Sequence, residues 1–388
     1  MISVTAAKKI IAANPLVLSA ETRPLSEVLQ RRLAADVFSP VDVPAFIQSS
    51  MDGYAFSYAS WKEKKALIIK GEMQAGAKTG FALAPGHAAR IFTGAPLPDG
   101  ADTVIMQEQV TIHNNTLTIT DENLQAGNSV RLAGSAIKAG MLAVPKDTLL
   151  SPGAIGFLAG MGINRVPVWS MPAVGVIVTG KELQQPGAPL SFGEVYESNS
   201  FALKAALQKI QIDAVKTYTV EDDLELVKQV LTQALSENDL VLLTGGVSVG
   251  DYDFVVQAAA ACGVEQLFHK IKQRPGKPLF FGKKENKLVF GLPGNPSSVL
   301  TCFYEYVLPA LKIQLPTMHA PLANSFKKTA GLTHFLKACW DGEKVLPLDA
   351  QESYRMRSFA VANCLIIVGE ETTFCEAGSL AEIHLLSF

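Results

Sequence analysis

The feature that most constrains the fold is a series of apolar runs that alternate with helical patterns between about Pro172 and about Leu315. Residues 173–180 (AVGVIVTG) and 239–246 (DLVLLTGG) are short, apolar and end in glycine, as is typical of buried parallel strands. Between them, residues 222–237 carry a helical apolar stripe with acidic residues in the first turn. This alternation predicts a doubly wound α/β sheet, which binds ligands beyond the carboxyl ends of its strands.

Length and composition indicate a globular protein with more than one domain. The chain has 388 residues, and a single hydrophobic core rarely organises more than roughly 250 to 300. Charged residues make up 18% and apolar residues 48%, and the formal net charge of -2 comes without a cluster of basic residues. These values argue against disorder and against a nucleic-acid partner.

The sequence also argues against a membrane partner. No segment reaches the ~18 consecutive apolar residues of a membrane span. The five cysteines are scattered, with neither a paired nor a zinc-binding spacing, and indicate free thiols in a reducing compartment. We therefore expect a cytoplasmic protein.

The predicted fold class is multidomain α/β plus β. We assign the central doubly wound α/β domain to residues 172–315. Residues 36–147 are rich in proline, glycine and β-branched residues and predict a β-rich insertion domain. Short β-like segments between residues 316 and 388 predict a small C-terminal β-barrel-like domain.

Two segments that flank the insertion have helical patterns. They are Leu25–Ala35 and Ser151–Gly162. We expect them to pack together, so that residues 1–35 and 148–171 form one elongated helical linking domain made from two parts of the chain.

Two glycine-containing turns follow predicted strands of the α/β domain. The first is TGGVSVGDYD, which begins at Thr244 and leads into a helical run. Glycines there let backbone N–H groups approach a phosphate. In the second, GLPGNPSS, Asn295 suits the N-cap, Pro296 the first helical position, and Ser297 adds a hydroxyl at the positive end of the helix.

Basic residues lie between the two turns in KIKQRPGKP: Lys270, Lys272, Arg274 and Lys277. Taken singly, these features also fit a tight connection, ordinary helix capping and a solvated basic face. Together they favour a site for a phosphorylated ligand, because the fold brings the ends of the strands to one edge.

Several acids follow the predicted strands and form a second group of candidates. Glu182, the neighbours Asp222 and Asp223, and the nearby Asp251 and Asp253 could hold Mg²⁺ if they meet at the carboxyl edge of the sheet. For Asp222 and Asp253, capping of the next helix is the alternative interpretation. Asp52 precedes a glycine in the insertion, where an ordinary turn is the alternative.

The chain resembles a known family over nearly its whole length. The segments SSMDGYAF, RIFTGAPLPDGADTVIMQE, TGKEL, YESN, VEDD, TGGVSVGDYDFV, RPGKPLFFG and GLPGNPSS occur in this order, and they are similar to motifs of the molybdopterin molybdenumtransferases and of the C-terminal domain of gephyrin. The resemblance implies an elongated homodimer of four-domain subunits. It also implies a reaction in which molybdenum from molybdate enters adenylylated molybdopterin, with Mg²⁺ as cofactor and AMP as a product, and an upstream molybdopterin adenylyltransferase as a partner.

The resemblance implies roles for individual residues. Asp52 would enter the active site of the partner subunit. Glu182, Asp222 and Asp253 would act as catalytic residues around Mg²⁺, molybdate and the scissile phosphate. The substrate-binding positions that match the family motifs are Thr93, Gly245, Gly246, Ser248, Lys270, Arg274, Lys277, Pro293, Asn295, Pro296 and Ser297.

The sequence departs from the family pattern in one place. The family usually carries an acidic pair in a stretch like NVRxxGED, where this chain has Ser135 and Ala136; a milder change places Glu197 where aspartate is common. The lost carboxylate at Ala136 keeps open an alternative function, that of a divergent paralogue that binds molybdopterin as a scaffold with weak turnover. A generic phosphotransferase is a weaker alternative, because it leaves Asp52 unexplained.

Overall fold

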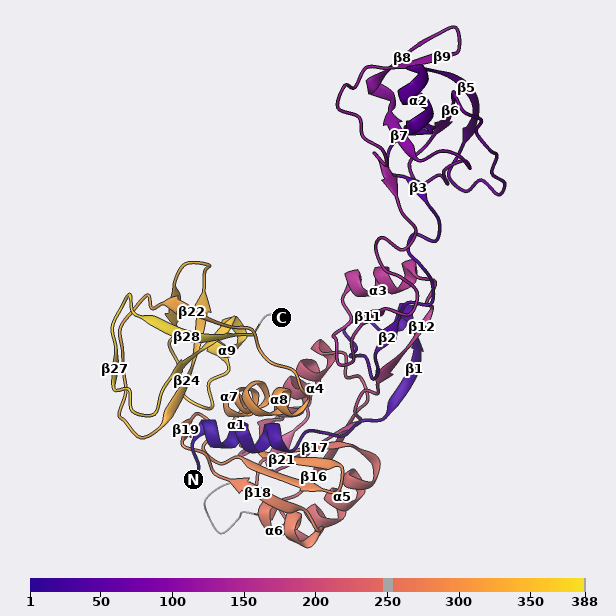
Figure 1. The fold of residues 1–388 in the computed structure, drawn as a ribbon. Helices are drawn as coiled ribbons and strands as arrows, with labels where there is room; N and C mark the ends of the chain where they lie inside the picture. Colours follow the sequence, from indigo (N-terminus) through magenta and orange to yellow (C-terminus); the bar gives the residue numbers. More distant parts are fainter. Residues whose placement is uncertain (247–253, 387–388) are drawn as a thin grey trace. The chain divides into compact units, whose positions relative to one another are not determined.

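The computed structural model describes residues 1–246 and 254–386, which form two compact units. The larger unit contains Met1–Leu18 and Met171–Phe388, and the smaller unit contains Ser19–Ser170. Figure 1 labels many of the elements of both. Each unit is described by itself.

The larger unit is built on a six-stranded α/β sheet. Its strand order is β16 (Val215–Val220), β13 (Val174–Thr179), β17 (Leu240–Thr244), β21 (Lys287–Leu292), β20 (Phe280–Lys284) and β18 (Glu265–His269). The first four strands are parallel, whereas β20 and β18 pair antiparallel with their neighbours. Every residue of β13 and β17 is buried, which explains why these runs are apolar throughout.

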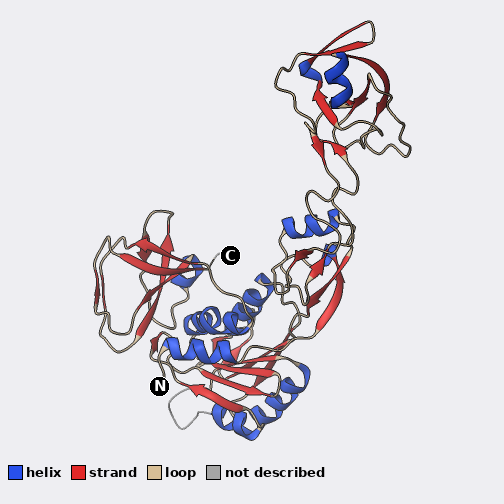
Figure 2. Ribbon diagram, in the orientation of Figure 1, coloured by secondary structure: helices blue, strands red, loops and turns tan. Residues whose placement is uncertain are grey.

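Helices cover both faces of this sheet (Figure 2). The apolar core on one face includes side chains of α1 (Val4–Ala13), α4 (Asn199–Lys209) and α7 (Pro296–Cys302). The core on the other face includes side chains of α5 (Leu224–Glu237) and α6 (Phe254–Ala261). The α/β prediction is therefore confirmed. Helix α7 continues through a π-helical segment, η3 (Phe303–Val307), into α8 (Leu308–Ala310).

The C-terminal part of the larger unit is a second, β-rich layer. Its sheet has the order β19 (Gln273–Arg274), β24 (Thr333–Trp340), β26 (Cys364–Val368), β28 (Leu380–Leu385) and β22 (Thr317–Pro321). The smaller elements of this part are β25 (Val345–Pro347), paired with β24, the pair β23 (Phe326–Lys327) and β27 (Phe374–Cys375), and α9 (Arg357–Val361).

Strand β19 links the two parts of the larger unit. It belongs to the basic segment of the α/β domain, but it pairs in parallel with β24, so that Gln273 lies opposite Thr333 and Arg274 opposite His334. The backbone N–H of Thr333 also donates to the carbonyl oxygen of Lys272 at 3.0 Å. The basic turn is thus fixed by both the α/β domain and the C-terminal sheet.

One half of the smaller unit is a six-stranded β-sheet. The order is β7 (Thr103–Met106), β4 (Gly53–Phe56), β6 (His87–Ile91), β5 (Ala66–Met73), β9 (Thr116–Ile119) and β8 (Val110–His113). The short elements beside it are α2 (Tyr58–Lys64) and η2 (Gln107–Gln109). Its cores include Phe56 and Leu67 on one side and Met73 and Ile91 on the other. A β-rich fold within the predicted insertion is confirmed.

The other half of the smaller unit contains short antiparallel pairs and one α-helix. The pairs are β1 (Ala20–Pro24) with β12 (Arg165–Trp169), β2 (Val37–Phe38) with β11 (Leu142–Val144), and β3 (Gln48–Ser49) with β10 (Val130–Arg131). The expected helix in Ser151–Gly162 is present as α3 (Pro152–Gly160), whose N-cap Ser151 accepts a hydrogen bond from the N–H of Ala154.

The helical prediction for Leu25–Ala35 was wrong beyond the short 3₁₀ turn η1 (Leu25–Glu27). Leu33 is fully buried, and it forms an isolated β-bridge with Val168. Pairing with β12 therefore holds this apolar segment in extended structure, although the spacing of its leucines is also compatible with a helix.

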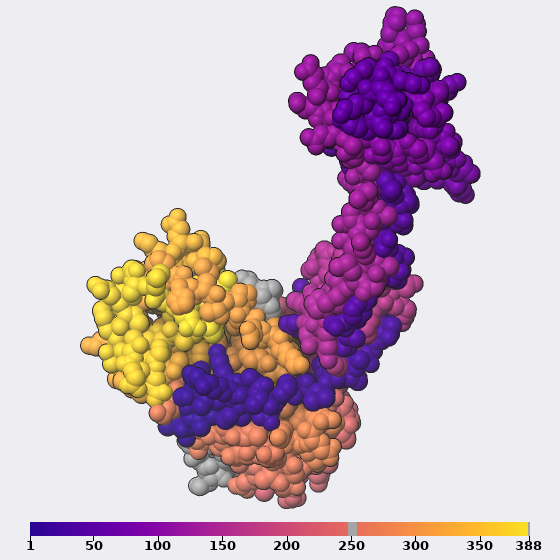
Figure 3. Space-filling model, viewed as in Figure 1, coloured from indigo at the N-terminus to yellow at the C-terminus, as the bar shows by residue number. Residues whose placement is uncertain are grey.

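The structure also differs from the expected linking domain at the N-terminus. Residues 1–18 belong to the larger unit and not to the unit that contains residues 19–35. The reason is the apolar face of α1, because Ala7 and Ile11 are fully buried in the core of the α/β layer. Figure 3 shows this N-terminal segment lying over the surface of that layer. The other predicted boundaries, at residues 36, 148 and 316, stay predictions.

Among the described residues, none of the helices has both the length and the apolar character that a membrane crossing requires. All five cysteines are free thiols, and Cys302 and Cys364 are buried.

Candidate functional site

A cleft of about 1140 Å³ opens in the larger unit where the central strands end. Thr179 and Thr244 are the last residues of β13 and β17, and Pro293 follows β21; all three line the cleft. The C-terminal part contributes Leu332 and the segment 351–354. The cleft therefore lies at the edge of the sheet where the sequence predicts a ligand.

Most of the predicted binding residues in this unit meet at the cleft. Those that line it are Glu182, Asp222, Gly245, Gly246, Arg274, Lys277, Pro293, Asn295 and Pro296. Lys270 and Ser297 do not line it, although Ser297 stands between two residues that do. Ser248 and Asp253 lie outside the described residues, and Asp52 and Thr93 belong to the smaller unit.

The first turn brings the backbone of β17 against that of β13. Gly245 has φ +88°, and a Cβ there would lie 2.6 Å from Oγ1 and 2.8 Å from the carbonyl oxygen of Thr179. Any residue other than glycine would both be strained and collide with backbone. The close approach leaves the peptide groups of this turn at the cleft surface.

Asp222, one of the two acids at the edge of the sheet, does not cap the helix that follows it. Asp223 is the N-cap of α5, because its Oδ1 accepts hydrogen bonds from the N–H groups of Glu225 and Leu226, both at 2.9 Å. The capping interpretation of Asp222 was therefore wrong. Asp222 is exposed and lines the cleft with the exposed Glu182.

The second turn ties the C-terminal part to the cleft. Asn295 occupies the N-cap position of α7 but makes no capping hydrogen bond with its side chain. Its Nδ2 instead donates to Oγ of Ser353 at 2.9 Å, and the N–H of Ser297 donates to the carbonyl oxygen of Ser353 at 3.1 Å. These bonds hold segment 351–354 as a wall of the cleft.

Glu197 has a structural role at the cleft. Its exposed fraction is 3%. Its carboxylate accepts hydrogen bonds from the N–H of Ser200 at 2.8 Å and from Oγ of Ser200 at 2.5 Å. The first turn of α4 thus uses both oxygens, and the longer glutamate at this position is accommodated.

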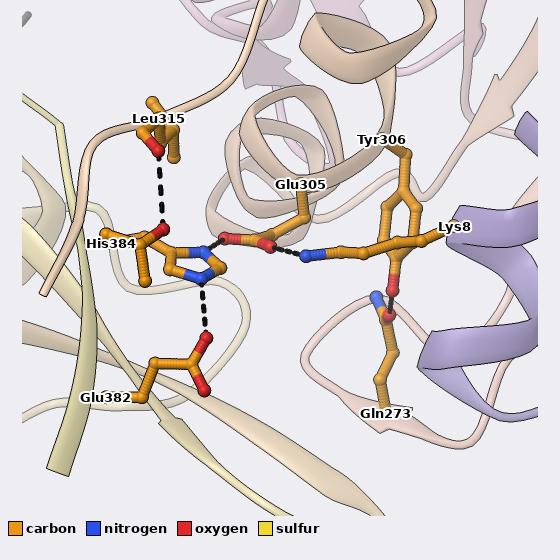
Figure 4. A network of polar contacts seen from close by, with 8 residues as sticks. Lys8, Gln273, Glu305, Tyr306, Leu315, Glu382 and His384 are labelled. Carbon is orange, nitrogen blue, oxygen red and sulfur yellow. Dashed lines mark hydrogen bonds and ion pairs between the residues drawn. The ribbon is translucent and has the colours of Figure 1, made fainter. Parts of the chain in front are cut away.

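The basic turn after β19 presents two cations to the cleft. Arg274 and Lys277 are exposed there, and neither side chain forms an ion pair or hydrogen bond with the described residues. Gln273 lies buried behind them, and its Nε2 donates to the carbonyl oxygens of Pro275 and Gly276, both at 3.0 Å. Tyr306 donates its hydroxyl hydrogen to Oε1 of Gln273 (Figure 4). The shape of the turn is therefore set from behind by η3.

A buried ionic network extends from the same π-helical segment (Figure 4). Glu305 is 1% exposed; its Oε2 lies 2.6 Å from Nζ of Lys8 and its Oε1 lies 2.6 Å from Nδ1 of His384. Nε2 of His384 lies 3.2 Å from Oε1 of Glu382. Burial opposes ionisation of Glu305, but the hydrogen bond from His384 and the charge of Lys8 lower its pKa. The network joins α1, η3 and β28.

The smaller unit brings together Asp52 and Thr93. Oδ1 of Asp52 accepts hydrogen bonds from both the N–H and Oγ1 of Thr93, each at 2.8 Å. The backbone hydrogen bond from Thr93, the side-chain bond and the charge of Arg90 together lower the pKa of Asp52. Asp52 is exposed, so it presents an ionised and oriented carboxylate at the surface.

Comparison with known proteins places the chain in a family. Residues 2–162 match the MoeA N-terminal region (domain I and II), residues 175–313 a probable molybdopterin binding domain, and residues 319–386 the MoeA C-terminal region (domain IV). A molybdopterin molybdenumtransferase of Haemophilus influenzae is 34% identical, with 98% of each chain covered. The chain belongs to the molybdopterin molybdenumtransferase family. Its members are transferases of molybdenum cofactor biosynthesis, and this family member is therefore an enzyme of that class.

Further relatives agree with this assignment. The molybdopterin molybdenumtransferase of Staphylococcus aureus is 32% identical over 95% of this chain and 91% of its own. A crystal structure of a molybdopterin biosynthesis moeA protein from Pyrococcus horikoshii has a TM-score of 0.84 and 30% identity, with 100% of both chains covered. The multidomain fold with α/β and β-rich parts is thus that of the family.

The acids of this molybdenumtransferase fit Mg²⁺. The described residues contain no group of three or more His, Cys, Asp or Glu side chains that could hold a metal ion. Mg²⁺ needs only one or two carboxylates when substrate phosphates supply further oxygens. Glu182 and Asp222 at the cleft provide such a donor set.

The residues behind and opposite the basic turn of this molybdenumtransferase were not predicted from the sequence. Gln273 and Tyr306 support the turn, and Gln351–Tyr354 form the opposite wall. The only local signal for Gln273 is its place before RPGKP. Tyr306 lies within an apolar helical run, where an aromatic residue predicts core packing.

Proposed function

We propose that the chain transfers molybdenum from molybdate to adenylylated molybdopterin and releases AMP. The observation that carries this proposal is the cleft, which brings two carboxylates and two cations without ionic partners among the described residues to the carboxyl edge of the sheet. Phosphoric anhydrides and molybdate are anions, and cations in a partly enclosed site stabilise both.

Each residue at the cleft has a task in this reaction. Arg274 and Lys277 would neutralise the phosphate oxygens of the substrate. Glu182 and Asp222, together with Asp253, would hold Mg²⁺. Bound Mg²⁺ would neutralise charge on the anhydride oxygens during their cleavage. No protein thiol is required, since the substrate carries its own sulfur atoms.

We also propose that the enzyme acts as a homodimer and that Asp52 of the partner subunit completes the cleft. Its support is the Thr93–Asp52 pair, which holds an ionised carboxylate at the surface of the smaller unit. Two-fold symmetry would then give each dimer two equivalent sites. A molybdopterin adenylyltransferase would supply the substrate.

The direct test is incubation of the full chain with adenylylated molybdopterin, Mg²⁺ and molybdate. Release of AMP that depends on molybdate supports the transferase. Tight binding of the substrate without release of AMP would favour the scaffold function instead, and the missing acid at Ala136 is the observation behind that alternative.

Replacing Lys277 or Arg274 with alanine should weaken binding of the phosphorylated pterin by ~1.5–3 kcal/mol, the scale of a hydrogen bond to a charged group. Both side chains are exposed, so folding should be unaffected. Equilibrium binding measures the effect. Lys272→Ala is the matched control, because Lys272 belongs to the same segment but pairs with Glu370 at 2.6 Å and does not line the cleft. Equal binding by all three variants would mean that the basic turn is a solvated surface that does not bind the ligand.

Ala136→Asp should lower the molybdate concentration that gives half-maximal release of AMP. Ala136 is exposed, and its backbone N–H donates to the carbonyl oxygen of Val43 at 2.9 Å. The stability change should therefore stay within ~0.5 kcal/mol. Gln125→Asp adds the same charge to another exposed loop of the smaller unit and is the control. A molybdate dependence identical in wild type and Ala136→Asp would mean that the acids at the cleft suffice.

A further inference from the structure

A second cavity of about 490 Å³ lies beside the cleft in the larger unit. It is lined by residues of β23 and β24 and by the basic turn, and Arg274, Pro275 and Gln351 line both spaces. We infer that this cavity is a second anion site, which binds a small tetrahedral oxyanion and, in the proposed reaction, holds molybdate next to the cleft. The role for molybdate rests on the proposed function, whereas the anion site itself does not.

The charge of the lining favours an anion. Arg274, Lys327 and Lys328 line the cavity, and no aspartate or glutamate of the described segments lines it. Arg274 has no ionic partner among the described residues, and Lys327 is exposed. An oxyanion in this space would meet cations from two sides, because Arg274 comes from β19 and the lysines from the end of β23.

Lys328 brings a cation into the wall that forms no ion pair with the described residues. Its exposed fraction is 8%, and its Nζ donates to the carbonyl oxygens of Leu332 at 2.8 Å, Glu370 at 3.1 Å and Thr329 at 3.5 Å. Burial lowers the pKa of Lys328, although the charges of Cys375, Glu371 and Glu370 oppose this. The carboxylate of Glu370 is itself paired with Lys272. Neutral carbonyl groups orient the ammonium group but leave its positive charge available to an anion.

His334 supplies a hydrogen-bond donor without a partner. The residue is 7% exposed, and neither ring nitrogen makes a hydrogen bond within the described part of the chain. Its ring packs edge-on against Phe326, with centroids 6.3 Å apart. Burial, and then the charges of Lys328 and Arg274, lower its pKa to about 4. The ring is therefore neutral at neutral pH, and its N–H, which has no acceptor among the described residues, can donate to a ligand in the cavity.

The backbone register places these groups together. Arg274 and His334 are paired residues of β19 and β24. Because Arg274 lines both spaces, an oxyanion held between Arg274 and His334 would lie at the boundary with the cleft. A small co-substrate bound there would adjoin the larger substrate without sharing all of its contacts.

The test follows the ring of His334 by nuclear magnetic resonance in the full chain while molybdate, sulfate or phosphate is added. Because a bound anion stabilises the protonated ring, the pKa of His334 should rise by about 1 unit or more. His334→Phe keeps the aromatic packing, identifies the resonance among the six histidines, and should weaken binding of the oxyanion about 10-fold or more.

Lys327→Ala and Lys344→Ala form a matched pair on exposed positions of the C-terminal part. Only Lys327 lines the cavity, so only its removal should weaken binding, by about 3- to 10-fold. Lys277→Ala removes a cation of the cleft alone and should leave the response of His334 in place. An unchanged His334 resonance at saturating oxyanion, or loss of its response in Lys277→Ala, would overturn the second site.

The same titrations separate this inference from the proposed function. Oxyanion binding at His334 without release of AMP would contradict the transferase but support the site. Release of AMP with an unresponsive His334 would overturn the site alone. Tighter binding of molybdate than of sulfate supports the role in holding molybdate, whereas equal binding of all three anions supports the site and overturns that role.

Discussion

Asp52→Asn should release AMP at least about 100-fold more slowly than the wild-type chain, the lower end of what a positioned catalytic side chain contributes. Asparagine has the same size and can still accept the two hydrogen bonds from Thr93. The substitution therefore removes the negative charge while it preserves the local structure. Asp99→Asn is the matched control, because Asp99 is an exposed acid of the same unit whose carboxylate makes no hydrogen bond with the described residues.

A mixture of Asp52→Asn with Asp222→Asn, which should also be slow because it removes an acid of the cleft, tests where Asp52 acts. If Asp52 of the partner subunit completes the cleft, a heterodimer of Asp52→Asn and Asp222→Asn retains one site with both acids. It should then recover about half of the wild-type rate, because two-fold symmetry gives two sites per dimer. A verified heterodimer that stays as slow as its parents would place both acids in the site of one subunit.

The parts of the fold that could be predicted from sequence are those in which local pattern and tertiary environment agree. Strands β13 and β17 are buried along their whole length, so their sequences carry no competing polar pattern. The glycines after β17 could be interpreted in the same way, because the positive φ of Gly245 is a property of the turn itself.

The predictions that failed depended on contacts between distant residues. Leu25–Ala35 has leucines at a spacing that also suits a helix, and its extended conformation follows from the bridge between Leu33 and Val168. The assignment of residues 1–18 to the linking domain failed because the apolar face of α1 matches a surface of the α/β layer. In both cases the contacting surface lies elsewhere in the chain, so the sequence of the segment itself does not reveal it.

The same distinction between local patterns and long-range contacts applies to the candidate site. The motifs predicted which residues meet at the cleft, but not what holds them. The pairing of Arg274 with His334 joins segments 60 positions apart, and the support of Gln273 by Tyr306 joins a polar residue to an apolar helix. The choice between Asp222 and Asp223 as the N-cap required the hydrogen bonds of Asp223.

Glu305→Ala should lower the free energy of unfolding of the larger unit by about 3–5 kcal/mol, the scale for removal of one member of a buried ion pair. The substitution leaves Lys8 without its anion and His384 with only its longer contact to Glu382, and it opens a space beside η3. Urea unfolding measures the change. Tyr306 is the next residue and holds Gln273, so the variant should also bind the phosphorylated pterin more weakly, through a displaced basic turn.

The pH dependence of stability distinguishes the electrostatic contribution of this network from the contribution of its packing. Burial disfavours the charged form of His384, but the hydrogen bond and charge of Glu305 outweigh it and raise the pKa above 6.5. The stabilisation is therefore complete below pH 6.5 and is lost as the pH rises through the pKa of the folded state. The pKa of Glu305 is lowered from 4.5, so its contribution is present above pH 4.5 and is lost as the pH falls through its folded value. Together they predict a plateau of stability between these two values.

His384→Gln should remove the loss of stability above the plateau, because glutamine does not titrate and still fills the site. His319→Gln on β22 of the same sheet should leave that loss unchanged, since His319, although opposite Glu382 in the sheet, is exposed and makes none of the contacts to Glu305 or His384. Urea unfolding from pH 5.5 to pH 8.5 compares the two variants with the wild-type chain. A wild-type profile that is flat over this range, or one that His384→Gln does not alter, would mean that Glu305 and His384 interact as a neutral hydrogen-bonded pair. The effect of Glu305→Ala would then reflect lost packing around η3, and the basic turn would depend on the shape of that helix instead of on its charge.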